Sequence, residues 1–146
     1  QIELTEWLAE EGVDIVLGSH PHVIQRTERL GSGGGGTIVA YSMGNFLSNQ
    51  RTETLDNPYT EDGVLLNFVI RKNHATGLTS VERIDSVPTW VYRYKETGKE
   101  TYAYRILPLG SDAGVDIDAF PADAAASMRR SYEATMAQME ATIDGK

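Results

Sequence analysis

Two histidines one residue apart, His20 and His22, are the side chains of this chain best suited to chemistry. In an extended segment the side chains of residues i and i+2 point the same way, so the two imidazoles can converge on one metal ion or serve two adjacent ions. Pro21 disfavours a helical conformation at His20. This suits a metal or active site, and it also suits a surface turn with two solvated rings.

The position of the pair favours a metal or active site. Residues 13–18 have the apolar character of a buried strand, and the histidines follow directly. Ligands and catalytic groups in open α/β sheets gather where strands end in loops. A zinc, manganese or iron site needs three or four ligands, so the partners of His20 and His22 would have to come from distant parts of the sequence.

A second transition from strand to loop places Asn45 after the strand expected at residues 37–42. An asparagine here could ligate a metal, hold a substrate oxygen or cap the turn. It gains functional interest if it lies beside His20. The third histidine, His74, falls in a turn-like stretch and is expected to be solvated.

The elements that must position these residues are read from periodicity and from turn residues. Helical spacing precedes Gly12, and a glycine-rich stretch at 31–36 predicts a mobile hairpin tip, since neither a helix start nor a Lys-Ser/Thr pair follows it. The polar stretch 49–62 is expected to be a surface loop. The predicted strands comprise residues 13–18, 23–30, 37–42, 64–70, 78–84, 87–94 and 101–107, with a hairpin turn at 96–99.

Two groups of large side chains invite either a packing or a binding interpretation. The last predicted hairpin would carry an aromatic cluster, in which a structural role is favoured over an exposed carbohydrate or polymer platform. Its members are Trp90, Tyr92 and Tyr94 on one face, opposite Tyr102 and Tyr104. After Pro121 a helical stripe is expected to pack on the sheet or on a second copy of the chain, as in a homodimer. The stripe consists of Met128, Tyr132, Met136, Met139 and Ile143.

Composition narrows the class of protein. The chain has 146 residues, of which 40% are hydrophobic and 23% charged, as expected of one globular domain. A net charge of -8 with 13 scattered basic residues argues against a nucleic-acid partner and against an anionic membrane surface. No apolar run approaches the roughly 20 residues of a transmembrane segment. The absence of cysteine excludes disulfides and thiolate ligands but leaves the compartment open.

Two ordered motifs carry a family resemblance. Residues 12–25, Gly-Val-Asp-Ile-Val-Leu-Gly-Ser-His-Pro-His-Val-Ile-Gln, are followed by Glu28 and then by residues 38–46, Ile-Val-Ala-Tyr-Ser-Met-Gly-Asn-Phe. Together they resemble the C-terminal part of the CapA-type, poly-γ-glutamate biosynthesis family of bacterial capsule-synthesis proteins. This family lies within the calcineurin-like metallophosphoesterase superfamily. The match is specific from about residue 1 to 71.

The resemblance implies an α/β fold, α+β in this part of it, derived from a four-layer sandwich with a two-metal site at the strand ends. His20 would serve one divalent metal and His22 the other, with manganese, iron and zinc unresolved. Ser19, which stands where the superfamily usually has glycine, and Asn45 of the Gly-Asn-Phe motif are the candidate substrate-binding residues. The early metal-binding elements, an Asp-x-His-like or Gly-Asp start and an Asn-His pair, have no counterpart here.

These observations predict a C-terminal fragment that begins within a helix at Gln1 without an initiator Met. Residues 1–110 would form part of the metallophosphoesterase-like domain, and residues 111–146 a linker and amphipathic helix. The parent would be a two-metal phosphoesterase-like enzyme of capsule polymer synthesis or export, with poly-γ-glutamate or capsule machinery as partners. It would act at the outer face of a bacterial membrane, with any anchor upstream. The alternative is a non-catalytic scaffold of the capsule machinery; the fragment itself is expected to have no catalytic residues.

Overall fold

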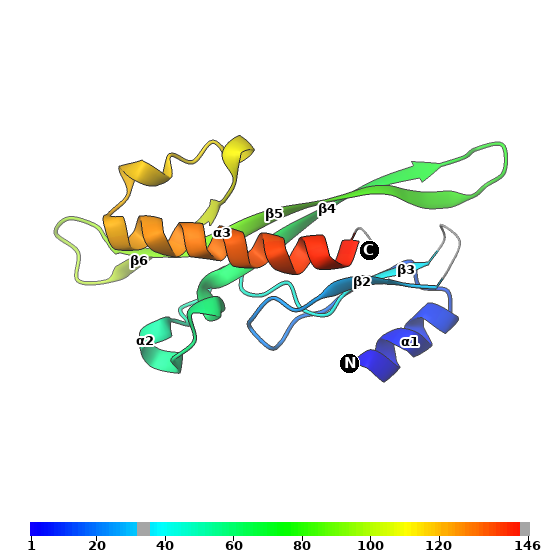
Figure 1. The fold of residues 1–146 in the computed structure, drawn as a ribbon, viewed down its shortest axis with the longest axis horizontal. Coiled ribbons are helices and arrows are strands. Elements are labelled where there is room, and N and C mark those ends of the chain that lie inside the picture. The colour runs from blue at the N-terminus through cyan, green and yellow to red at the C-terminus, as the bar shows by residue number, and fades with distance from the viewer. Residues whose placement is uncertain (32–35, 144–146) are drawn as a thin grey trace.

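The computed structural model describes residues 1–31 and 36–143, and of residues 140–143 the backbone alone. Helices and strands are mixed, strands predominate and a helix lies towards each end, which confirms the predicted α+β character (Figure 1). The glycine-rich tip predicted at 31–36 falls largely outside the described residues. The elements are α1 (Ile2–Glu10), β1 (Ile15–Leu17), β2 (Thr27–Leu30), β3 (Thr37–Ala40), α2 (Thr52–Leu55), η1 (Pro58–Glu61), β4 (Asp62–Lys72), β5 (Thr79–Lys95), β6 (Tyr102–Pro108), η2 (Ser111–Ala113), η3 (Ile117–Ala119) and α3 (Ala122–Ile143).

The first sheet has the strand order β1-β3-β2, with β1 parallel and β2 antiparallel to the central β3. All four residues of β3 are buried, as its run of β-branched and small apolar side chains requires. Because β1 and β3 are parallel, their carboxyl ends meet at one edge of the sheet. The histidines follow β1 and Asn45 follows β3, so both segments start from this edge.

The second sheet is antiparallel, with the order β4-β5-β6. The alternation predicted for residues 64–70 is seen in β4, while β5 runs without a break through the two strands predicted at 78–84 and 87–94. Residues 79–88 of β5 pair with β4 alone, so that part of the β4–β5 hairpin projects as a two-stranded ribbon (Figure 1). His74 is exposed in the turn of this ribbon, as predicted.

The predicted cross-strand aromatic cluster is wrong in one respect. Paired residues of adjacent strands share a face, and the register pairs Tyr92 with Arg105 and Tyr102 with Lys95. The aromatics of β5 therefore stack along their own strand, with ring centroids 5.9 Å apart for Trp90 and Tyr92 and 5.3 Å apart for Tyr92 and Tyr94. Tyr102 lies on the opposite face, beneath the cationic ends of neighbouring side chains of β5.

The C-terminal helix α3 packs on both sheets. Its Met128 is fully buried in a cluster with Trp90, Leu107 and Leu109 of the second sheet. About one turn before the end of the helix, Met139 is buried against β2, where Thr27 Oγ1 lies 3.8 Å from its sulfur. The predicted Met-rich stripe thus packs within this chain as far as Met139, while the side chain of Ile143 lies outside the described residues. The helix α3 crosses from one sheet to the other (Figure 1).

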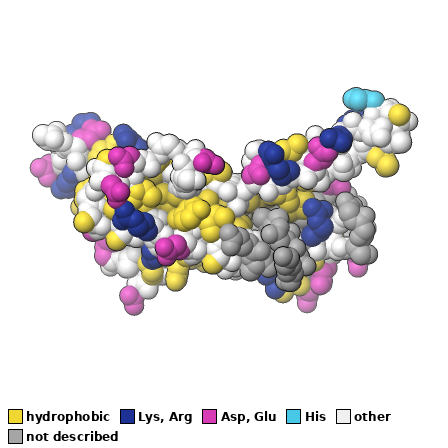
Figure 2. Space-filling model, turned by 45° about the horizontal axis from the view of Figure 1, so that its top comes forward, with side chains coloured by type: hydrophobic (Ala, Val, Ile, Leu, Met, Phe, Trp, Pro, Cys, Tyr) yellow, Lys and Arg dark blue, Asp and Glu magenta, His cyan; other side chains and the backbone are white. Residues whose placement is uncertain are grey.

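The surface of the molecule mixes charges of both signs. Acidic and basic side chains are interspersed over the face shown in Figure 2, with hydrophobic side chains gathered towards its middle. On α1 three apolar residues are about half exposed, at 51% for Ile2, 58% for Leu4 and 53% for Trp7. The helix itself forms where its spacing predicts it, but its apolar side has little cover from the described residues.

Candidate functional site

The histidine loop, residues 18–22, runs beside the segment that follows β3. Gly18 N donates to Ala40 O at 2.6 Å, and Met43 N donates to Gly18 O at 3.3 Å. A Cβ at position 18 would overlap Tyr41 O, so only glycine lets the two backbones come this close. The two strand-to-loop transitions identified in the sequence therefore form one continuous structure at the edge of the first sheet.

The backbone of the histidine loop is not extended. His20 has φ 109° and His22 has φ 59°, values in the left-handed region that side chains with a Cβ rarely adopt. The argument that residues i and i+2 share a direction therefore does not apply to this pair. Both rings are exposed, and Ser19 is exposed beside them. Neither Ser19 nor His20 makes a side-chain hydrogen bond to the residues that the structure describes.

Asn45 contacts His22, whereas the sequence suggested His20 as the neighbour of interest. The amide oxygen of Asn45 lies 2.7 Å from Nδ1 of His22. Its amide nitrogen donates to Thr60 O at 2.8 Å, to His22 O at 3.1 Å and to Gln50 Oε1 at 3.2 Å. Asn45 is 6% exposed, so this side chain is a buried anchor for the ring rather than a free turn cap.

These contacts fix which nitrogen of His22 carries the proton in the neutral ring. The partners of the Asn45 nitrogen are all oxygen acceptors, so the amide cannot be turned around without placing oxygen against oxygen. Its Oδ1 must then accept from Nδ1–H of His22. The lone pair of the neutral imidazole consequently resides on Nε2, which is the state needed for a metal ligand or a proton acceptor.

The residues present satisfy part of what a metal centre requires. An exposed imidazole whose Nδ1–H is held by an amide oxygen is the arrangement seen around metal-binding histidines. However, no group of three or more His, Cys, Asp or Glu side chains gathers anywhere in residues 1–31 and 36–139. A stable site needs three or four ligands, so the described part of the chain offers one prepared ligand, not a complete centre.

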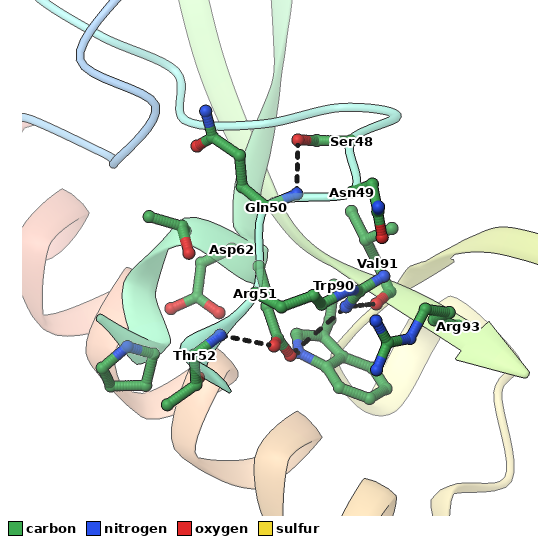
Figure 3. A network of polar contacts seen from close by, with 12 residues as sticks. Ser48, Asn49, Gln50, Arg51, Thr52, Asp62, Trp90, Val91 and Arg93 are labelled. Carbon is green, nitrogen blue, oxygen red and sulfur yellow. Dashed lines mark hydrogen bonds and ion pairs between the residues drawn. The ribbon is translucent and has the colours of Figure 1, made fainter. Parts of the chain in front are cut away.

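A buried polar network lies behind Asn45, in the stretch 45–62 that we call the bridging segment. Arg51 donates from Nη1 to Val91 O at 2.6 Å and lies 3.4 Å from Glu61 Oε2 (Figure 3). The same carboxylate accepts from Trp90 Nε1 at 3.1 Å and, through Oε1, from Thr52 N at 3.3 Å. Arg51 is 3% exposed and Glu61 9% exposed. The prediction of a surface loop at 49–62 is therefore wrong for these residues.

Burial sets the electrostatics of this network. It lowers the pKa of Arg51, because the charged guanidinium is costly away from water, and the carboxylate of Glu61 opposes that shift. Nε and Nη2 of Arg51 are buried without a hydrogen-bond partner among the described residues. The guanidinium also faces the ring of Tyr104, 5.7 Å from its centroid. Removing Glu61 would leave a buried cation with few compensating contacts.

A second ion pair, between the partly exposed Arg130 and the buried Asp62, joins the end of the bridging segment to α3. Arg130 donates from both terminal nitrogens to Asp62, at 2.8 and 2.9 Å, and from Nη2 to Pro58 O at 3.0 Å. Burial raises the pKa of Asp62, and the hydrogen bonds from Arg130 act in the opposite direction. Asp62 O in turn accepts from Asn45 N at 3.0 Å. The two ends of the bridging segment, Asn45 and Asp62, are thus hydrogen-bonded to each other, and Arg130 attaches Asp62 to α3.

Comparison with known proteins agrees with the two sequence motifs. The model of a family described as bacterial capsule synthesis protein PGA_cap matches residues 1–50, which contain both the histidine loop and Asn45. Over this part, the chain is similar to the CapA-type capsule synthesis family. The description of that family names capsule synthesis as its process.

Two CapA proteins of known name show the extent of the match. The chain is 34% identical over 85 residues to the PGA biosynthesis protein CapA of Bacillus subtilis (strain 168). These 85 residues are 58% of this chain and 20% of that protein. It is 33% identical over 73 residues to the capsule biosynthesis protein CapA of Bacillus anthracis, covering 50% of this chain and 16% of that protein. The matched segment therefore spans a fifth or less of each relative's length.

No solved structure matches the chain significantly. Among the described residues, no helix combines the length and the apolar character that crossing a membrane requires.

Proposed function

We propose that this chain supplies the histidine element of a two-metal, phosphoesterase-like site in a protein of capsule polymer synthesis or export. The observation that carries the proposal is the contact between Asn45 and His22, which leaves Nε2 of an exposed ring available at the carboxyl ends of β1 and β3. Divalent ions bound there would activate water and stabilise charge on phosphoryl oxygens. The metal identity, manganese, iron or zinc, is left open by imidazole ligands.

Each residue of the site has a distinct part in this proposal. His22 presents a neutral imidazole with Nε2 unprotonated, and His20 would serve the second ion. Asn45 holds the ring of His22 and its own amide stays shielded from water. Ser19 lies at the exposed start of the loop, where it could contact a bound substrate. The remaining ligands would come from residues beyond those described, since a three-ligand group does not form among the described ones.

A non-catalytic role in the capsule machinery is the second candidate. It is favoured by the lack of a three-ligand group among the described residues. A direct contact with poly-γ-glutamate through charge is not favoured in either case, because the chain has a net charge of -8 and its basic side chains are dispersed (Figure 2). Action at the outer face of the membrane is part of the same proposal and follows from the capsule as product.

Manganese titration of the chain separates the two candidates. Mn²⁺ broadens the NMR signals of nearby nuclei, so we expect it to broaden the ring signals of His20 and His22 at concentrations that leave His74 sharp. His74 serves as a control within the same molecule, since it is exposed in the ribbon turn. Equal broadening of all three rings would contradict a metal site. In the same solution the chain should show no phosphodiesterase activity on bis(p-nitrophenyl) phosphate; measurable hydrolysis would refute the proposal that its ligand set is incomplete.

A further inference from the structure

The orientation of Asn45 depends on residues far from the histidine loop in sequence. Of the oxygens that receive its amide hydrogens, one belongs to Gln50 and one to Thr60. Gln50 directly precedes Arg51, and Thr60 directly precedes Glu61. The side chains of Arg51 and Glu61 are within ion-pair distance of each other, at 3.4 Å. The two acceptors are therefore adjacent in the chain to the two members of one buried ion pair.

Glu61 is the centre of this arrangement. Its carboxylate accepts from Trp90 of β5 and from the backbone of Thr52 at the start of α2, in addition to facing Arg51. Figure 3 shows the side chains of Arg51 and Trp90 lying together, with Val91 beside them. The network thus fixes the bridging segment against the second sheet, whereas the histidine loop belongs to the first sheet. Hydrogen bonds of this kind are stronger when one partner is charged, which suits a precise anchor.

We propose that the buried network of Arg51, Glu61 and Trp90 is a positioning device for His22. It holds Gln50 and Thr60 where they receive the Asn45 amide, and the amide in turn selects the Nδ1–H form of the His22 ring. None of the three network residues touches the histidine in the contacts of the described residues, so their role is positioning and not catalytic. The inference rests on the proposed function in one respect only: the proposed metal site is what would use the Nε2 lone pair of His22.

The tautomer of His22 can be measured without metal and without activity. Long-range ¹H–¹⁵N NMR spectra of the chelator-treated chain near neutral pH distinguish Nδ1–H from Nε2–H imidazoles. The three rings are assigned with His20→Gln and His74→Gln variants. In the unmodified chain we expect His22 in the Nδ1–H form and the exposed His74 as a mixture of forms. A mixture at His22 as well would overturn the inference.

Two substitutions test the network, one by removing the charge of Glu61 and one by removing the hydrogen-bond donor of Trp90. Glu61→Gln keeps the shape of the side chain but removes the charge that faces Arg51. Trp90→Phe removes the indole N–H that donates to Glu61, together with part of a ring that packs in the core. Each should lower the ratio of Nδ1–H to Nε2–H at His22. The ratio falls roughly fivefold if the preference for the Nδ1–H form drops by the net free energy of one hydrogen bond. If Glu61→Gln fails to fold, Trp90→Phe still decides the question. An unchanged ratio in folded Trp90→Phe would show that the network supports the fold without acting on His22.

A core variant gives the matched control. Leu109→Ala loosens the same hydrophobic cluster in which Trp90 lies but removes no polar contact of Glu61. It should lower the thermal midpoint while His22 keeps its Nδ1–H form. A change of tautomer in Leu109→Ala equal to that in Trp90→Phe would refute a specific positioning role. A shifted tautomer in the network variants together with no Mn²⁺ binding by the unmodified chain would uphold this inference and contradict the metal site.

Discussion

Replacing Asn45 by leucine tests the anchor of the site directly. Leucine has a similar size and branching point, so the change removes hydrogen bonds with little change in volume. The backbone hydrogen bond from residue 45 N to Asp62 O is kept in the variant. Thr60 O, His22 O and Gln50 Oε1 lose their donor, and His22 Nδ1 loses its acceptor. The effect on stability therefore measures the side-chain contacts of Asn45 alone.

The magnitude follows from which of these groups water can reach. Thr60 O makes a buried contact, so leaving it unpaired costs about 1–3 kcal/mol. His22 O and Gln50 Oε1 are partly buried, and each loses about 0.5 kcal/mol once water replaces the amide. The exposed ring of His22 regains its hydrogen bond from water. We expect the free energy of unfolding to fall by about 2–4 kcal/mol, or the thermal midpoint by roughly 10 °C.

Urea unfolding followed by far-ultraviolet circular dichroism gives the free energy. The fluorescence of Trp90, measured with Trp7 replaced by phenylalanine, reports on the adjacent network. Asn67→Leu is the matched control, because Asn67 is exposed on β4 and the same chemical change there should alter the free energy of unfolding by less than about 0.5 kcal/mol. A loss in Asn45→Leu no larger than that of the control would refute the role of Asn45 as the anchor of the histidine loop.

Two further predictions concern packing. Gly18→Ala places a methyl group against Tyr41 O and should cost about 2–3 kcal/mol as the loops separate; a thermal midpoint equal to that of the unmodified chain would contradict their close approach. Thr135→Val should leave the free energy of unfolding unchanged or raise it by up to about 1 kcal/mol, because Thr135 Oγ1 is buried without a partner among the described residues. Thr37→Val, which loses the hydrogen bond to Val13 O, should lose about 1 kcal/mol, and urea unfolding of both variants checks the contrast.

Elements with a regular side-chain period were predictable from the sequence. The N-terminal helix, the alternating strand β4 and the Met-rich helix α3 form where their patterns indicate. Each of these patterns is local, because residues on one side of a helix recur every 3.6 positions and those on one side of a strand every 2. The location of both candidate loops at one edge of the first sheet was predictable for the same reason. The strands β1 and β3 have recognisable patterns, and each loop begins where its strand ends.

The buried ion pair in the bridging segment was not predictable in this way. Arg51 and Glu61 lie in a polar stretch whose composition is that of a surface loop, and a buried pair leaves no periodic pattern. One local signal was available. Asn57 followed by Pro58 is a common start of a helical turn, and Asn57 Oδ1 does accept from Tyr59 N in the structure. This signal indicates a turn, but not what the turn buries.

The aromatic faces were assigned wrongly because strand register depends on the turn. The loop between β5 and β6 holds an even number of residues, so Trp90 pairs with Leu107 and shares its face, while Tyr102 and Tyr104 lie on the other. One residue more or fewer would have reversed the result. Likewise, the choice of His22 over His20 as partner of Asn45 depends on two left-handed backbone angles, and residue types alone do not specify these angles.

The contact of α3 with both sheets has a consequence for synthesis of the protein. The histidine loop, the bridging segment and the second sheet all precede α3 in the sequence, so they leave the ribosome before it. Arg130, which holds the carboxylate of Asp62, arrives with the helix. A nascent chain that ends before Arg130 therefore contains both histidines and Asn45 but lacks the guanidinium that neutralises the buried end of their support. The histidine loop is thus synthesised early, and the ion pair that supports it forms only once α3 has been made.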